Sequence, residues 1–212
     1  MSTGRRAAAS AAAAGGTGTG NRRGREPRRF LALLIAALLP GTAVAAVDGC
    51  VALDAWRDTG VAGAPRWNLG HEAEARIADE GDRVFDATLV SPVFAVPRSG
   101  LELRWEQRRQ FSWASSAGVL EIAVDGGPWR DFTAAGGRFL AGGYDSHAFA
   151  GNPLGARAAW GGDAADGETR AALPAAVGGR QARLRFRLGS SGTGDARAGW
   201  QLSAFHCEAP LS

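Results

Sequence analysis

The sequence contains no lysine, so all 24 of its basic residues are arginine. A phosphate-binding loop that needs a lysine to contact the nucleotide is therefore excluded. Histidine occurs three times, at His71, His147 and His206. A three-histidine metal site would need all three side chains to converge, and His71-Glu72 opens like a zincin helix but lacks the second histidine. Surface positions are the alternative for these histidines.

Cysteine is also scarce, since only Cys50 and Cys207 are present, separated by most of the chain. In an oxidising compartment such a pair predicts one disulfide that joins the two ends of a domain. A closed loop of this length contributes about 4–5 kcal/mol to stability in the chain-entropy description. Two unrelated buried thiols are the alternative.

Long hydrophobic runs are absent except for residues 30–39, FLALLIAALL. This run follows an arginine-rich stretch and precedes the small residues 43–45. The pattern predicts a disordered basic region and a secretory signal peptide over residues 1–45. An uncleaved inner-membrane anchor over 30–46 is the alternative, at the lower limit of length for a span. A single domain over 46–212 is then expected to be periplasmic or extracellular.

Charge is divided unevenly along the chain, whose formal net charge is +3. Residues 1–45 hold seven arginines and one glutamate, which gives +6. Residues 46–212 hold 17 arginines and 20 acidic residues, which gives −3. The predicted domain is therefore mildly acidic and offers no electrostatic reason to bind nucleic acid.

Helix-period segments of useful length are absent, whereas strand patterns are frequent. Large apolar residues alternate with charged ones over 101–111 and 182–190, which predicts strands with one buried face. The run 119–124 leads into Asp125-Gly126-Gly127, a hairpin-type turn. The arginines of the second alternating run, Arg183, Arg185 and Arg187, are expected on an outer, solvated face, paired with acids of a neighbouring strand.

Two further strands are expected over 87–96, broken by Pro92, and over 199–207, while Gly-rich loops are expected over 136–167. Short strands separated by glycine-containing turns predict an all-β fold, a two-sheet antiparallel jelly-roll sandwich.

An ordered set of motifs within this pattern resembles the MAM-like, concanavalin A-like jelly-roll modules of bacterial secreted proteins. Such modules follow fungalysin-type and immune-inhibitor-type metallopeptidases and occur in adhesins. The matching motifs are Asp-Gly-Gly plus Trp, Gly-Gly-Tyr, Asn-Pro-Leu reaching Trp, and Gly-Trp. They fall here on Asp125, Gly126, Gly127, Trp129, Gly142, Gly143, Tyr144, Asn152, Pro153, Leu154, Trp160, Gly199 and Trp200. The resemblance covers residues 50–208 and implies a jelly-roll fold and a non-catalytic role in interaction.

The chain departs from this family pattern at two places. Residues 113–118 replace a Tyr-Asp-Gly-Gly segment, and residues 201–203 replace a pair of aspartates after the closing tryptophan. If those acids hold a cation in the family, that site is degraded here. Calcium remains a candidate ligand of Asp163, Asp166 and Glu168, which lie in a stretch expected to be a Gly-rich loop. Solvated loop acids are the alternative, and no other cofactor is indicated.

The aromatic content suggests where a ligand could bind. Trp105, Trp129, Trp160 and Trp200 fit inward or motif positions and are expected in the core. Trp113 breaks the family pattern, and with Phe111 and Tyr144 it forms the candidate ligand patch.

One strand carries two acids that could suggest catalysis. Glu121 and Asp125 share a strand face, as in laminarinase-type glucanases, but four strand residues span about 13 Å, too far for paired catalytic carboxylates. A solvated Glu121 and a turn-forming Asp125 are the simpler interpretation. The sequence therefore favours a non-catalytic, envelope-associated module that binds carbohydrate or protein. A glycan hydrolase that uses Glu121 and a purely structural envelope protein are the alternatives.

Overall fold

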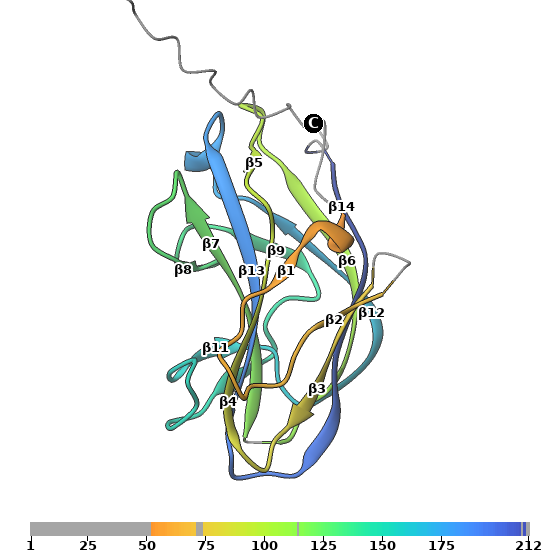
Figure 1. Cartoon of the computed structure of the whole chain (residues 1–212). Helices are drawn as coiled ribbons and strands as arrows, with labels where there is room; N and C mark the ends of the chain where they lie inside the picture. Colours follow the sequence, from red (N-terminus) through yellow and green to blue (C-terminus); the bar gives the residue numbers. More distant parts are fainter. Residues whose placement is uncertain (1–51, 71–73, 114, 209, 211–212) are drawn as a thin grey trace, which may run out of the picture. The chain divides into compact units, whose positions relative to one another are not determined.

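A computed structural model of the chain describes residues 52–70, 74–113, 115–208 and 210, which form two antiparallel sheets packed face to face (Figure 1). The two-sheet antiparallel sandwich predicted from the sequence is therefore confirmed. The predicted signal peptide and anchor lie outside the described residues. Among the residues described, no helix is long and apolar enough to cross a membrane.

The first sheet has the strand order β1-β4-β13-β7-β8, with β5 also paired to β13. Its strands are β1 (Arg57–Asp58), β4 (Val84–Val90), β5 (Phe94–Ala95), β7 (Ser116–Val124), β8 (Arg130–Asp131) and β13 (Gln181–Ser191). The predicted alternation along β13 is confirmed, because Leu184, Phe186 and Leu188 are fully buried between the sheets. The three arginines between them point to the outer face, as expected.

The second sheet has the strand order β2-β3-β14-β6-β12-β9. Its strands are β2 (Asn68–Leu69), β3 (Ala75–Glu80), β6 (Glu102–Gln110), β9 (Arg138–Ala141), β12 (Asp163–Ala172) and β14 (Ala196–Glu208). Leu103 and Trp105 on β6 are fully buried, which confirms the alternation predicted there. Two short 3₁₀ turns, η1 (Leu53–Ala55) and η2 (Ala175–Val177), complete the regular structure together with the β10–β11 hairpin.

This hairpin, β10 (Ser146–Ala148) and β11 (Arg157–Ala159), covers the outer face of β7. Ala117 and Val119 on β7 are buried beneath it, together with Leu154 from the hairpin loop. Because the core covers the inner face and the hairpin covers the outer one, nearly every residue of β7 is buried.

The core between the sheets is rich in tryptophan. Trp56, Trp105, Trp160 and Trp200 are at most 1 % exposed. Edge-to-face contacts at 5.4–6.1 Å link Trp105, Trp160, Trp200 and Phe186, and Trp56 stacks on Phe186 at 5.5 Å. Each such contact adds about 0.5–1.5 kcal/mol beyond area burial. Gly118 on β7 permits this packing, since a Cβ there would lie 2.7 Å from the ring of Trp200.

Two expectations about the elements are wrong. The stretch 136–167 is not merely loop, because it contains β9, β10, β11 and the start of β12. These strands are short or exposed. The alternation of apolar and polar residues that marks a strand in a sequence is therefore weak there. Trp129 is only half-buried rather than a core residue, because it lies in the turn that follows β7.

Candidate ligand-binding surfaces

Trp113 lies in the turn between β6 and β7 and is the most exposed large hydrophobic residue described, at 78 %. Its ring packs on Gly162, where a Cβ would lie 3.0 Å from the ring. Asp163 follows directly and pairs at 2.7 Å with Arg197 on β14, and both side chains are exposed. An aromatic ring, a carboxylate and a guanidinium therefore gather at one end of the sandwich, here called the Trp113 end.

The turn that carries Trp113 is held by hydrogen bonds to the buried carboxylate of Asp79. Asp79 is fully buried and accepts hydrogen bonds from the Ser112 amide at 2.6 Å and the Ser116 hydroxyl at 2.7 Å. Burial raises the pKa of Asp79, and these two hydrogen bonds offset only part of that rise. These bonds hold the residues on either side of Trp113, and ordering a side chain before binding lowers the entropy cost of binding a ligand.

The candidate patch of Trp113, Phe111 and Tyr144 does not form. Phe111 is 1 % exposed and packs edge-to-face on Trp200, 5.6 Å away. Tyr144 is half-buried and packs on Trp160 in the core. Phe111 is buried because it continues the inward-facing positions of β6, so only Trp113 of the three is available to a ligand.

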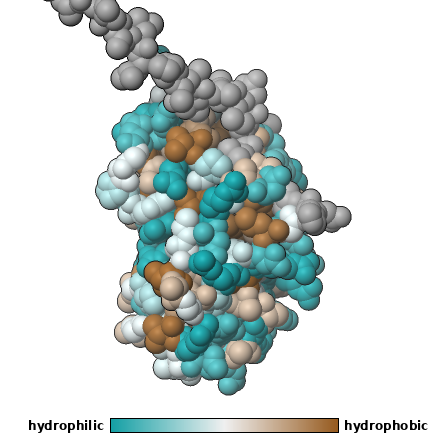
Figure 2. Space-filling model, in the orientation of Figure 1, coloured by the Kyte–Doolittle hydropathy of each residue, from teal (hydrophilic) through white to brown (hydrophobic). Residues whose placement is uncertain are grey.

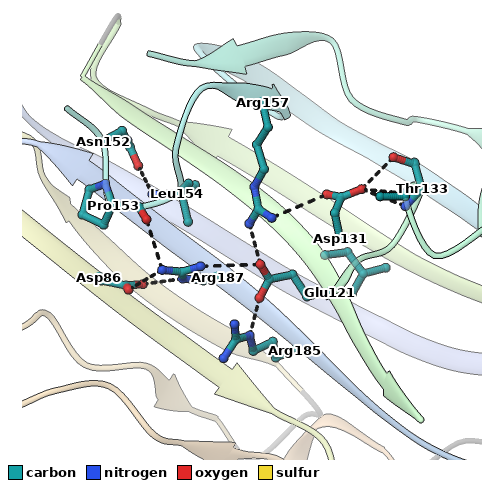
Figure 3. Close-up of polar contacts among 12 residues, drawn as sticks. Asp86, Glu121, Asp131, Thr133, Asn152, Pro153, Leu154, Arg157, Arg185 and Arg187 are labelled. Carbon is teal, nitrogen blue, oxygen red and sulfur yellow. Dashed lines mark hydrogen bonds and ion pairs between the residues drawn. The ribbon is translucent and has the colours of Figure 1, made fainter. Parts of the chain in front are cut away.

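The outer face of the first sheet carries a dense charge network centred on Glu121 (Figure 3). Arg157 contacts Glu121 at 2.6 Å, Arg185 pairs with it directly across the strands, and Arg187 lies 3.5 Å away. Arg187 also holds Asp86 through two hydrogen bonds of 2.6 and 2.8 Å. The predicted pairing with acids of neighbouring strands is therefore confirmed for Arg185 and Arg187. Arg183 instead lies over the ring of Trp129, 5.5 Å from its centre, and makes no ion pair with a described carboxylate.

Glu121 itself is not solvated, contrary to the expectation from sequence, because Arg157 reaches over it from β11 and leaves its side chain 4 % exposed. Burial alone would raise the pKa of Glu121. The hydrogen bonds and charges of Arg157 and Arg185 outweigh that effect and hold the pKa below its ordinary value. A glycosidase acid must instead stay protonated near neutral pH, so Glu121 is poorly suited to that role.

Asp125, the other acid of that strand, forms the predicted turn, with the left-handed backbone that the position requires (φ 49°). Its carboxylate pairs at 2.9 Å with Arg180 and accepts a hydrogen bond from the Gln181 amide at 3.0 Å. Its two oxygens therefore bind Gln181 at the start of β13 and Arg180 just before it, which explains its position without a catalytic role.

A shallow hollow of about 240 Å³ lies beside this network, between the arginines and the segment after β1. Arg185 and Arg187 line it together with Asp86 and the hydroxyl-bearing Thr59 and Thr88. The two hydroxyls bond to each other at 2.7 Å. Further along the same face, Trp129 stacks under Arg185, whose guanidinium lies 4.6 Å from the ring centre. This hollow was not foreseen from the sequence, because the segment after β1 has no strand pattern.

The three acids considered for calcium are not in a loop but on β12. Asp163 is paired with Arg197 and Glu168 with Arg104, while Asp166 is exposed. Within the part of the chain that the structure describes, no group of three or more histidine, cysteine or acidic side chains could hold a metal ion. His147 and His206 are exposed, in agreement with the surface alternative, and His71 lies outside the described residues.

Cys207 lies on β14 and packs, half-buried, against the core. Its predicted partner Cys50 lies outside the described residues, so the Cys50–Cys207 disulfide stays a prediction.

The chain is similar to three solved structures at low sequence identity. The carbohydrate-binding module TmCBM61 in complex with β-1,4-galactotriose is 13 % identical, with a TM-score of 0.40 over 74 % of this chain and 90 % of that one. The K1 cleaved adhesin domain of Lys-gingipain from Porphyromonas gingivalis W83 is 14 % identical, with a TM-score of 0.37 over 77 % and 95 %. TmCBM27, a carbohydrate-binding module that recognises mannan, is 7 % identical, with a TM-score of 0.35 over 76 % and 95 %.

No protein-family model and no curated protein matches the chain. The function is therefore argued from the side chains of this protein alone.

Proposed function

We propose that the domain is a non-catalytic module that binds glycan chains at the Trp113 end. The observation that carries the proposal is the 78 % exposure of Trp113 on a turn fixed by buried hydrogen bonds. A tryptophan buries about 150–250 Å² when it is covered, so an exposed ring lacks the hydrophobic stabilisation that this burial would give. A ligand with a flat apolar face would recover it, and a pyranose ring has such a face.

The groups around the ring suit a sugar better than an apolar partner. Asp163 and Arg197 offer planar acceptors and donors that can bind neighbouring hydroxyls, and Gly162, which has no side chain, lets the ring pack close to them. Other exposed large hydrophobic residues are scattered over the sequence: Val61, Val84, Val93, Leu140 and Phe149. On the face seen in Figure 2, the hydrophobic residues form small separate patches. A protein interface of ordinary size would need a broader apolar centre.

The test is glycan-array binding followed by affinity electrophoresis, with Trp113→Ala compared with Trp129→Ala. Trp129 is a matched control, because it lies beyond the opposite end of β7, about 27 Å along the strand. We expect Trp113→Ala to weaken binding at least tenfold, as for an aromatic residue that dominates a contact, and Trp129→Ala to leave it unchanged. Absence of glycan binding by the wild type, or loss of binding only in Trp129→Ala, would overturn the proposal.

Glycan binding is proposed to need no cation, because Asp163 and Glu168 already have arginine partners. Repeating the array with EDTA tests this directly. Loss of binding that calcium restores would instead support the calcium prediction for Asp163, Asp166 and Glu168.

Export of the domain is part of the same proposal, since an exterior glycan requires an exterior protein. The basis is the basic and apolar pattern of residues 1–45. Cell fractionation with N-terminal sequencing of the mature protein tests it. A cytoplasmic protein that begins at residue 1 would contradict export, and an uncleaved membrane-bound protein would favour the anchor.

A further inference from the structure

A second hollow, of about 290 Å³, lies on the outer face of the second sheet and was not foreseen from the sequence. Four polar side chains line it, and the backbone of β14 near Gly199 and Trp200 completes it. The four are Arg76, Arg108, Gln110 and Gln201. They come from the three adjacent strands β3, β14 and β6, so the hollow is built on the sheet itself.

Strand register aligns three of these side chains in one row. Gln201 on β14 lies opposite Arg76 on one side and Arg108 on the other. Neighbouring strands lie about 4.8 Å apart, so the backbones of the two arginines lie about 10 Å from each other, with the Gln201 side chain between them. This spacing allows both guanidinium groups to reach a ligand seated over Gln201.

A β-bulge in β14 shapes the hollow. The register of β14 against β3 shifts between Arg197 and Trp200, and Ala198 has no opposite residue in either neighbouring strand. Gly199 has φ +89°, and a Cβ there would collide with the carbonyl oxygen of Ile77. A bulge leaves its extra residue outside the ladder, and Ala198 lines the hollow at this point.

Arg108 differs from the neighbouring arginines because its charge is not paired with a described carboxylate. On β3, β6 and β14, Arg76, Arg104 and Arg197 each pair with a described carboxylate, at Glu74, Glu168 and Asp163 respectively. Arg108 makes no ion pair with any carboxylate that the structure describes. Gln201 donates a hydrogen bond to Glu74, which fixes its amide beside the hollow. Arg108 therefore supplies a positive charge that has no ion-pair partner among the described residues, next to the amide groups of Gln110 and Gln201.

We propose that this hollow binds an oxyanion, a carboxylate or a sulfate, carried by the same glycan that stacks on Trp113. The inference rests on the proposed function and specifies its ligand as an acidic glycan. A guanidinium with adjacent amide donors matches the planar acceptors of a carboxylate or the oxygens of a sulfate. The site adjoins the Trp113 end, because Gln110 lies opposite both Gly199 and Asp163, and Trp113 follows three residues later.

The site is tested first without a polymer, by NMR of the arginine Nε–H groups in the full domain. D-glucuronate and glucose 6-sulfate are titrated at constant ionic strength, with glucose as the neutral probe and Arg108→Gln to assign the signal. We expect the Arg108 signal to move with an anionic sugar and not with glucose. A response to glucuronate alone identifies a carboxylate site, and a response to the sulfate alone identifies a sulfate site. An Arg108 signal that moves with neither anion would overturn the proposal.

The second measurement compares affinity for oligogalacturonate and for its neutral methyl ester. Arg104→Gln is the matched control, because it removes an equal charge from the same strand and face, about 13 Å away. If the NMR titration identifies a carboxylate site, we expect the wild type to prefer the acid about tenfold, Arg108→Gln to lose that preference and Arg104→Gln to keep it. For a sulfate site, a sulfated dextran and unmodified dextran replace this pair.

The outcomes separate this inference from the function it rests on. Equal Trp113-dependent binding of acidic and neutral chains, unchanged in Arg108→Gln, would overturn the anion site and leave the glycan-binding function intact. A response of the Arg108 signal to glucuronate without binding of any oligosaccharide would support the anion site and overturn the glycan-binding function. Thermal unfolding of both variants checks the fold, which a substitution at an exposed arginine should change little.

Discussion

The hydroxyl oxygen of Tyr144 lies 3.0 Å from both the amide nitrogen and the carbonyl oxygen of Leu120. A loop side chain thus bonds the backbone of β7, a central strand, and it also lies 3.1 Å from Asp131 on β8. Its ring packs on Phe139 and Trp160 with ring centres 4.8 Å away. Burial, followed by the negative charge of Asp131, raises the pKa of Tyr144, so the phenol stays neutral.

Replacing Tyr144 with phenylalanine tests this attachment, because the ring stays and only the hydroxyl is lost. The Leu120 amide then loses an acceptor in a half-buried site, so we expect the free energy of unfolding to fall by about 1–3 kcal/mol. Urea unfolding measures the change. An unchanged midpoint would show that water or the strand itself replaces the hydroxyl.

Glu121→Gln removes the charge to which three arginines are directed. Breaking a buried ion pair by removing one partner costs about 3–5 kcal/mol, and we expect a loss near the lower figure at pH 7. The pKa of Glu121 is lowered by folding, so its contribution is present above its ordinary value of 4.5 and is lost as pH falls through the folded value. The difference between wild type and variant should therefore shrink in acid. Asp125→Asn, at an exposed turn, is the control and should change little.

Asp79→Asn should behave in the opposite way. Burial raises the pKa of Asp79, so its contribution to stability is greatest below its ordinary value of 3.8 and is lost as pH rises through the folded value. At neutral pH the charged carboxylate opposes folding, and an asparagine can still accept from the Ser112 amide. We expect the variant to be more stable than the wild type at pH 7 and to lose this advantage near pH 3. A pH series of thermal unfolding curves decides, and a variant less stable at pH 7 would contradict the expectation.

Gly199→Ala tests the bulge on which the second hollow depends. The positive φ and the collision with Ile77 should cost at least about 2 kcal/mol in the free energy of unfolding. Gly167→Ala on β12 is the matched control, since a Cβ there has 3.8 Å of room and the backbone is ordinary. Equal effects of the two substitutions in urea unfolding would contradict this account.

The sequence predicted the sandwich because β6 and β13 bury apolar side chains on one face and carry charged side chains on the other. The alternation of apolar and polar residues could not reveal β12, because most of its first six residues are exposed and its register shifts between Ala164 and Gly167. It placed Glu121 correctly on the outer face but not in a buried network, because Arg157 arrives from a hairpin 36 residues away. Trp113 was identified only because it breaks a family pattern.

The residues that carried the resemblance support the structure rather than a ligand. Asn152 is buried and donates hydrogen bonds to the carbonyls of Ser115 and Gly189, at 2.9 and 2.8 Å, which anchors the hairpin loop to the turn before β7 and to β13. The indole of Trp160 donates to the Gly142 carbonyl at 2.9 Å. Motifs of this kind report how loops are attached to a sandwich, so they predict fold better than they predict binding.

The uneven burial of the seven tryptophans gives the protein a built-in optical reporter. Trp67 and the four core tryptophans are at most 5 % exposed, so a water-soluble quencher reaches Trp113 first and the half-exposed Trp129 second. Fluorescence that iodide or acrylamide removes from the native domain therefore comes mainly from the proposed binding end. A ligand that covers this ring protects the emission, and its affinity can be measured without a label.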